Sequence, residues 1–125
     1  MSFLPVGSPA LELLGSTGIG GFTLQNATPI LFTFEIPNDG EMHRICAFGE
    51  LVVASAQTGG VISVLMNDPG GTPRTRSLFN GGSGAGYSAI DGFLTLVGPG
   101  QLVTVQQTSV QSAGAAEAWI EIWGS

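Results

Sequence analysis

The stretch EAWIEIW, residues 117–123, alternates aliphatic side chains with charged or aromatic ones. A period of two is typical of an extended strand, because successive side chains then point to opposite faces of a sheet. We expect one face to lie in a core: Ala118, Ile120 and Ile122. The opposite face carries Trp119 and Trp123, the only tryptophans in the chain. Rings of this size usually bury most of their surface, so this face also needs a cover.

The composition around this stretch is that of an all-β domain. The chain has 125 residues, which favours one domain with a single core. Its 20 glycines and seven prolines are scattered between short runs rich in Val, Ile, Phe and Thr. This pattern is typical of short strands separated by turns. Three arginines, no lysine and nine acidic residues give a net charge of −6, which argues against nucleic acid or an anionic membrane as partner.

Strand signals follow one another closely from residue 22 onward. PILFTFEIP (29–37) places Ile30, Phe32, Phe34 and Ile36 on one face. HRICAFGELVVAS (43–55) has a core face of alternate residues and a mixed second face that includes Phe48. TGG (58–60) predicts a turn into VISVLMN (61–67), which is apolar enough for burial on both faces. Further runs at 74–79, 87–97 and 101–108 bring the total to about eight strands, which fits a two-sheet sandwich, with an antiparallel jelly roll as our choice.

The first 21 residues differ from the rest of the chain. We expect residues 1–21 to form an extended N-terminal arm and residues 22–125 the jelly-roll domain. PALELL (9–14) predicts one helical turn ended by Gly15, and GSTGIGG (15–21) a flexible joint. The arm either folds back over its own domain or docks on another subunit or protein. The start lacks a basic segment and is broken by prolines, so we expect no signal peptide and a mature protein that begins close to Met1. No apolar run reaches the length of a membrane span.

Catalytic chemistry is hard to assemble from these residues. Cys46 and His43 lie three apart on one predicted strand and therefore point to opposite faces. Asp39 and Glu41 fall in a predicted turn, where carboxylates are usually solvated, although they could join a weak calcium site. We predict no enzyme, no metal site and no cofactor. A hydrolase based on His43 and the nearby acids is a minor alternative.

Three segments carry a resemblance to a known family. They are the long early strand HRICAFGELVVAS followed by TGG and VISVLM, then DGFLTLVGPGQLVTVQQ, and last the closing strand AWIEIW. Over roughly residues 30–123 the chain resembles the trimeric jelly rolls of the complement-type globular head and tumour necrosis factor superfamily. It is similar to the versions found in bacteriophage head-decoration and fibre proteins. The chain lacks a collagen stalk and an evident secretion signal, which favours a bacteriophage or other intracellularly assembled origin over an animal cytokine-like one.

The resemblance implies a function and a set of contact residues. It implies a homotrimer whose interface contains Trp119, Trp123 and Phe48, in a decoration or cement protein on the outside of a bacteriophage head. Such a protein is made in the host cytoplasm and binds the major capsid protein. The arm would provide the anchoring side chains: Phe3, Leu4, Leu11, Leu13 and Leu14.

Three alternatives stay open. The arm could cover the two tryptophans within one chain, or the tryptophans could form a platform on which a ligand stacks. The protein could also be the receptor- or carbohydrate-binding head of a fibre. That function would require Tyr87, Trp119 or Trp123 to be exposed near the loops at 68–73 and 80–86.

Arg74 and Arg76 are expected on a loop or edge strand, where either could contact an acidic neighbour.

Overall fold

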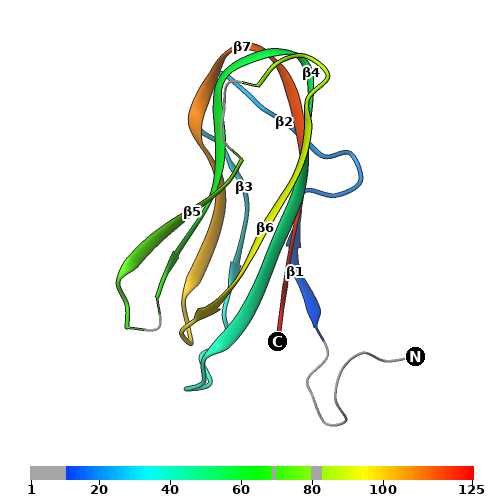
Figure 1. Ribbon diagram of the computed structural model, residues 1–125. Coiled ribbons are helices and arrows are strands. Elements are labelled where there is room, and N and C mark those ends of the chain that lie inside the picture. Colours follow the sequence, from blue (N-terminus) through cyan, green and yellow to red (C-terminus); the bar gives the residue numbers. More distant parts are fainter. Residues whose placement is uncertain (1–10, 69, 80–82) are drawn as a thin grey trace, which may run out of the picture.

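The computed structural model describes residues 11–68, 70–79 and 83–125, and these ranges contain seven antiparallel strands and no helix (Figure 1). The strands are β1 (Glu12–Ser16), β2 (Phe22–Thr23), β3 (Ile30–Glu35), β4 (His43–Asn67), β5 (Pro73–Phe79), β6 (Ser88–Val97) and β7 (Leu102–Gly124). The prediction of an all-β antiparallel jelly-roll sandwich is confirmed. Within the described ranges no helix is long and apolar enough to cross a membrane.

Two long strands organise the molecule. β4 has 25 residues and β7 has 23, and they pair with each other along almost their whole length. Both bend at the end of the molecule drawn uppermost in Figure 1, so each one passes from one layer of the sandwich into the other. The structure therefore has seven strands rather than about eight, because two of them serve both layers.

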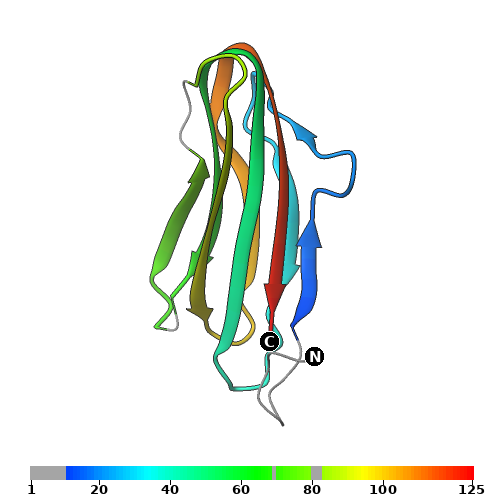
Figure 2. The ribbon, with the colours of Figure 1, turned by 45° about the vertical axis from the view of Figure 1, so that its right-hand side comes forward.

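Each layer takes half of the β4–β7 pair and adds strands at its edges. In the first layer, β6 pairs with the first half of β4, while β1 and β2 pair with the second half of β7. In the second layer, β5 pairs with the second half of β4, and β3 pairs with the first half of β7. Figure 2 shows β1 lying beside the C-terminal end of β7. The layer orders β1-β7-β4-β6 and β3-β7-β4-β5 are those of a jelly roll.

The predicted turn at 58–60 is wrong, since β4 continues through it. Here the ladder between β4 and β7 is interrupted by register shifts rather than ended, and Gly59 and Gly114 adopt φ of 75° and 90°. A Cβ on Gly114 would overlap the carbonyl oxygen of Ala56, and one on Gly59 would overlap that of Val110. The two strands remain partners across the bend, so bulges with glycine take the place of a hairpin turn.

The predicted helical turn before Gly15 is also wrong in the part that the structure describes. Residues 12–16 form β1, an extended strand that pairs with β7 and contains a bulge between Leu13 and Gly15. The unpaired edge of β7 supplies backbone partners for this segment, and that gain outweighs a weak local preference for helix. Leu14 packs against the core, beside Gly124.

The core lies between the two layers and follows the predicted alternation. Its fully buried members include the predicted inward faces of 43–55 and 117–123: Ile45, Ala47, Leu51, Val53, Ala118, Ile120 and Ile122. Ile30 departs from the prediction, because it is 57% exposed while Phe32 and Phe34 pack on the core. A bulge between Ile30 and Phe32 shifts the register by one residue, and such a shift moves a side chain to the other face.

Candidate interaction surface

The outward side of the first layer carries a group of exposed hydrophobic residues from β1, β4 and β6. We call it the outer face and define it by these outward-pointing residues of β1, β4, β6 and β7: Leu13, Arg44, Cys46, Phe48, Glu50, Val52, Ile90, Leu94, Leu96, Glu117, Trp119, Glu121 and Trp123. Ile90 is 81% exposed, Leu94 69% and Phe48 44%. Single exposed apolar residues are common, but a contiguous group on one sheet is typical of a contact surface.

The register of the strands brings these side chains together. Phe48 lies opposite Glu121 on β7, and Glu50 lies between Trp119 and Ile90 on its two neighbouring strands. Directly opposed side chains on adjacent strands are close enough to interact. The aromatic residues predicted for the trimer interface are therefore on one surface, where Glu50 and Glu121 separate them.

Trp119 is partly covered by its own chain. Its indole Nε1 donates a hydrogen bond to the carbonyl oxygen of Ile19 at 2.9 Å. Gly21 lies against the ring, since a Cβ there would come within 2.8 Å of it. The alternative in which N-terminal residues cover a tryptophan within one chain is thus realised in part, by the turn at residues 17–21. The ring nevertheless remains only half-buried.

Trp123 has different contacts. Its Nε1 donates to Oε2 of Glu121 at 2.9 Å, and it lies opposite Leu13 of β1 and Cys46 of β4. It too is half-buried. Both indole N–H groups are satisfied within the chain, so a partner that covers these rings would gain apolar contact without leaving a buried donor unpaired.

Three shallow hollows surround Trp119. One of about 210 Å³ is lined by Phe48, Glu50 and Ile90, and one of about 270 Å³ by Val52 and small neighbouring residues. The third, about 220 Å³, lies beside the turn at 17–21. Each has room for a side chain of a partner protein. Sequence reasoning missed Ile90, Leu94 and Leu96, although their alternation along 88–97 was the available signal.

The predicted arm residues have separate positions. Leu11 is 48% exposed and Leu13 50%, whereas Leu14 is partly buried against the core. Phe3 and Leu4 lie outside the described residues. Residues 12–16 of the predicted arm are therefore paired with β7, and Leu11 and Leu13 are the members of the set seen to be exposed.

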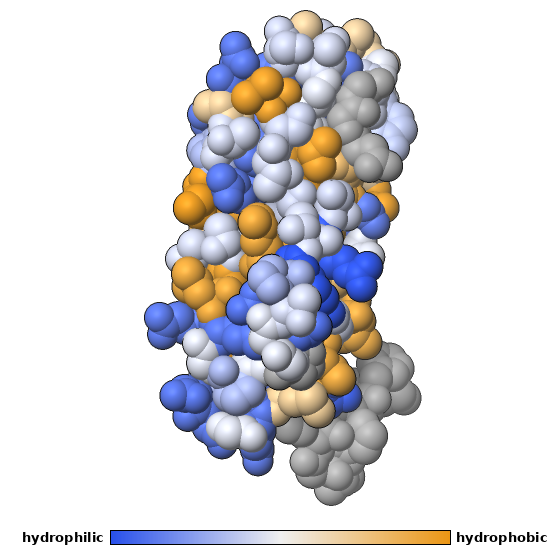
Figure 3. All heavy atoms as spheres, turned by 90° about the vertical axis from the view of Figure 1, so that its left-hand side faces the viewer, coloured by the Kyte–Doolittle hydropathy of each residue, from blue (hydrophilic) through white to orange (hydrophobic). Residues whose placement is uncertain are grey.

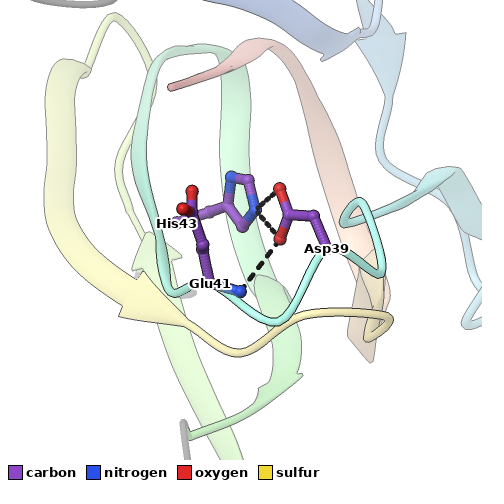
Figure 4. A network of polar contacts seen from close by, with 3 residues as sticks. All are labelled: Asp39, Glu41 and His43. Carbon is purple, nitrogen blue, oxygen red and sulfur yellow. Dashed lines mark hydrogen bonds and ion pairs between the residues drawn. The ribbon is translucent and has the colours of Figure 1, made fainter.

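Residues 39–43 form a turn whose polar groups bond one another (Figure 4). Nε2 of His43 lies 3.0 Å from both carboxylate oxygens of Asp39, and the backbone N–H of Glu41 donates to Oδ1 of Asp39 at 3.0 Å. The hydrogen bond from His43, with a smaller contribution from Glu41, lowers the pKa of Asp39 below its usual value. Asp39 is exposed, so this effect is small in energy.

This turn offers little for catalysis or metal binding. His43 points to the core side of β4 and Cys46 to the outer face, as predicted. Across the part of the chain that the structure describes, no group of three or more His, Cys, Asp or Glu residues could hold a metal ion. The geometry instead matches a structural hydrogen-bond contact between His43 and Asp39 that fixes the 38–42 connection to β4.

Polar and apolar residues alternate on the side of the molecule that carries β5. Figure 3 shows hydrophobic residues there that are separated by hydrophilic ones. Arg74 of β5 donates to Oγ1 of Thr95 and to the carbonyl oxygen of Leu96, at 2.9 and 2.7 Å, and so bonds β6 rather than the acidic neighbour considered from the sequence. Arg76 is exposed.

Comparison with known proteins gives likenesses of fold. No family model matches the chain, and no curated protein matches it. The crystal structure of the infectious bursal disease virus VP2 subviral particle matches 94% of the chain with a TM-score of 0.63 and 13% identity. The structure of the Gx strain of the same virus matches 92% with a TM-score of 0.62 and 13% identity. This protein spans 32% of either matched chain. Its fold therefore corresponds to a segment that makes up about a third of the length of each viral chain.

Proposed function

We propose that this protein is a structural component of a virus particle and that it acts as a homotrimer. The observation that carries the proposal is the outer face, a rigid sheet surface on which Phe48, Ile90 and Leu94 are exposed beside two half-buried tryptophans. The fold agrees with this role, since its structural relatives are chains of virus particles. A surface of this kind suits permanent contact with other copies or with a shell.

In the proposed trimer the outer face lies toward the threefold axis. Trp119, Trp123 and Phe48 then become interface residues, and Ile90 and Leu94 extend the contact onto β6. Fully burying a large apolar side chain contributes about 1.5–3 kcal/mol, so a few such residues per copy suffice for a stable association. Closed cyclic symmetry would limit the assembly to a defined number of subunits.

We propose further that the trimer decorates the outside of a bacteriophage head and cements it. The arm at residues 1–21, through Phe3, Leu4 and Leu11, would contact the major capsid protein, while Leu13, which lies opposite Trp123, would join the trimer contact. Leu14, which packs on the core, would tie the arm to the domain. Binding to the assembled shell but not to its free subunits stabilises the shell by mass action. The protein would be made in the host cytoplasm and located on the virion surface, with no enzymatic role, nucleic acid or membrane partner.

The test is the native mass of the full chain, measured by light scattering, for the wild type and two variants. Phe48→Asp places a charge on the outer face, and Val110→Asp makes the same change at a residue of equal exposure outside it, 43% against 44%. We expect the wild type and Val110→Asp to be trimers and Phe48→Asp to be monomeric. A monomeric wild type would contradict the proposed trimer. A trimeric Phe48→Asp would show that the outer face is not the interface of the trimer.

The capsid contact is tested separately by sedimenting the protein with candidate phage heads. Deleting residues 1–11 removes the chain before β1, with Phe3, Leu4 and Leu11, and leaves the described sheet intact. We expect this truncated protein to keep its mass but to lose binding to the heads. Unchanged binding would show that Phe3, Leu4 and Leu11 are not the anchor.

A second candidate function has one specific observation in its favour. Tyr87 is 47% exposed and lines a hollow of about 380 Å³ together with Ser83 and Asp91. An aromatic ring beside hydroxyl and carboxylate groups is suited to a sugar. A fibre head that binds carbohydrate would lose glycan binding in Tyr87→Ala while its mass stayed unchanged. If the protein bound no sugar in a glycan array, the carbohydrate-binding function would be contradicted and the decoration role would remain.

A further inference from the structure

Strand β6 forms one edge of the first layer. It has ten residues and pairs with β4 alone. In an antiparallel pair, alternate residues direct their backbone N–H and C=O toward the partner strand. The residues between them direct these groups away from it. The carbonyl of Leu96 and the N–H of Gly92 bond groups other than β4, which identifies the even-numbered residues as the outward set.

A long edge with free backbone groups is a template for a further strand. On the outward side of β6, the backbone groups of Ile90 and Leu94 have no partner among the residues that the structure describes. Their side chains are also among the most exposed apolar ones in the molecule, at 81% and 69%. A second β6, placed antiparallel beside the first, would pair these groups and continue the apolar outer face across both copies. Apart from Asp91, β6 contains no charged residue that would oppose this pairing.

Two side chains occupy this edge. The guanidinium of Arg74 reaches from β5 across the open side of the sandwich and donates to the carbonyl oxygen of Leu96 at 2.7 Å and to Thr95 at 2.9 Å. Nearer the middle of the strand, the carboxylate of Asp91 accepts the outward N–H of Gly92 at 2.8 Å. Each takes a backbone group that an added strand would need, and each places a charge where that strand would lie.

We propose that Arg74 and Asp91 block the β6 edge against pairing with β6 of a second copy. The block prevents two copies from joining through this edge, a contact that would link one native assembly to another. Arg74 also links the β5 and β6 edges, because its hydrogen bonds join one layer to the other. This inference does not depend on the proposed virion role, since it concerns which contacts the free protein avoids.

The test compares Arg74→Ser with Arg76→Ser by sedimentation velocity at equal protein concentration. Both variants lose one positive charge from β5, but Arg76 is exposed and makes none of the edge contacts described above. We expect Arg74→Ser to give a several-fold larger fraction of species heavier than the native assembly, and Arg76→Ser to match the wild type. Equal fractions in the two variants would overturn the proposal.

A double variant separates edge pairing from simple unfolding. Ser88→Pro, at the first residue of β6 and outside the outer face, removes an outward N–H that does not bond β4, so the existing ladder survives while an added strand loses a donor. In the Arg74→Ser background we expect Ser88→Pro to return the heavy fraction to the wild-type level. If the heavy species came from unfolding, the proline would increase them, and that result would contradict edge pairing.

Discussion

Replacing Gly114 by alanine should destabilise the protein strongly, because this residue lies where the β4–β7 pair bends. Its φ is 90°, a left-handed conformation that costs an L-residue about 1–2 kcal/mol. The added Cβ would also meet backbone that cannot rotate away: it would overlap the carbonyl oxygen of Ala56 and lie 2.8 Å from Cα of Gln57. Relieving such overlap costs a further 1–3 kcal/mol, approximately. We therefore expect a loss of about 2–5 kcal/mol in the free energy of unfolding.

Gly40 provides the matched control. Its φ is 76°, similar to that of Gly114, but a Cβ there would meet nothing within 4 Å. Gly40→Ala should therefore cost only the conformational contribution, about 1–2 kcal/mol. Urea unfolding followed by tryptophan fluorescence, at one fixed protein concentration, gives both values, and a constant m-value shows that the comparison is valid.

The comparison can contradict the account of the bend directly. If Gly114→Ala lost no more stability than Gly40→Ala, then β4 and β7 would not approach each other closely at this point. The continuous bent pair would then be an incorrect description, and a conventional turn with separate strands would replace it.

Three further predictions concern polar contacts. Asp39→Asn should reduce the midpoint of thermal unfolding above about pH 4 and leave it unchanged near pH 2, because the lowered pKa of Asp39 contributes stability that is lost as its carboxylate is protonated. Trp119→Phe removes the donor to Ile19 and should cost about 0.5–1.5 kcal/mol in urea unfolding, with faster proteinase K cleavage at residues 17–21. Gln107→Leu removes three hydrogen bonds to backbone groups, two to Gln25 and one to Ser109, and should cost about 1–3 kcal/mol by the same assay; no loss would show that water replaces these bonds.

Part of the candidate surface could be predicted from the sequence. The alternation in 117–123 assigned Ile120 and Ile122 to the core and Trp119 and Trp123 to the other face, and the structure places them so. The alternation in 43–55 assigned Phe48 to the second face of its own strand, and only the family resemblance grouped it with the tryptophans. Whether these residues form a trimer interface stays a prediction, since faces follow from local alternation and contacts between copies do not.

Other features of the surface depend on residues far apart in the sequence. Trp119 and Ile19 are separated by 100 positions, and no periodicity in either segment indicates that the indole bonds that carbonyl. Arg74 likewise bonds Thr95 and Leu96, which lie 21 and 22 positions later in the sequence and belong to the other layer. Such pairs become neighbours only when the layers are assembled.

The sequence by itself determined the strand class and the inward and outward faces, because burial with a period of two is set by the geometry of each strand alone. The tertiary structure alone decided that β4 and β7 continue through 58–60 and 112–116. A glycine cluster fits either a turn or a bulge, and the choice depends on whether the partner strand remains paired across it. It also decided that residues 12–16 are a strand, since the hydrogen bonds that hold them come from β7, at the other end of the chain.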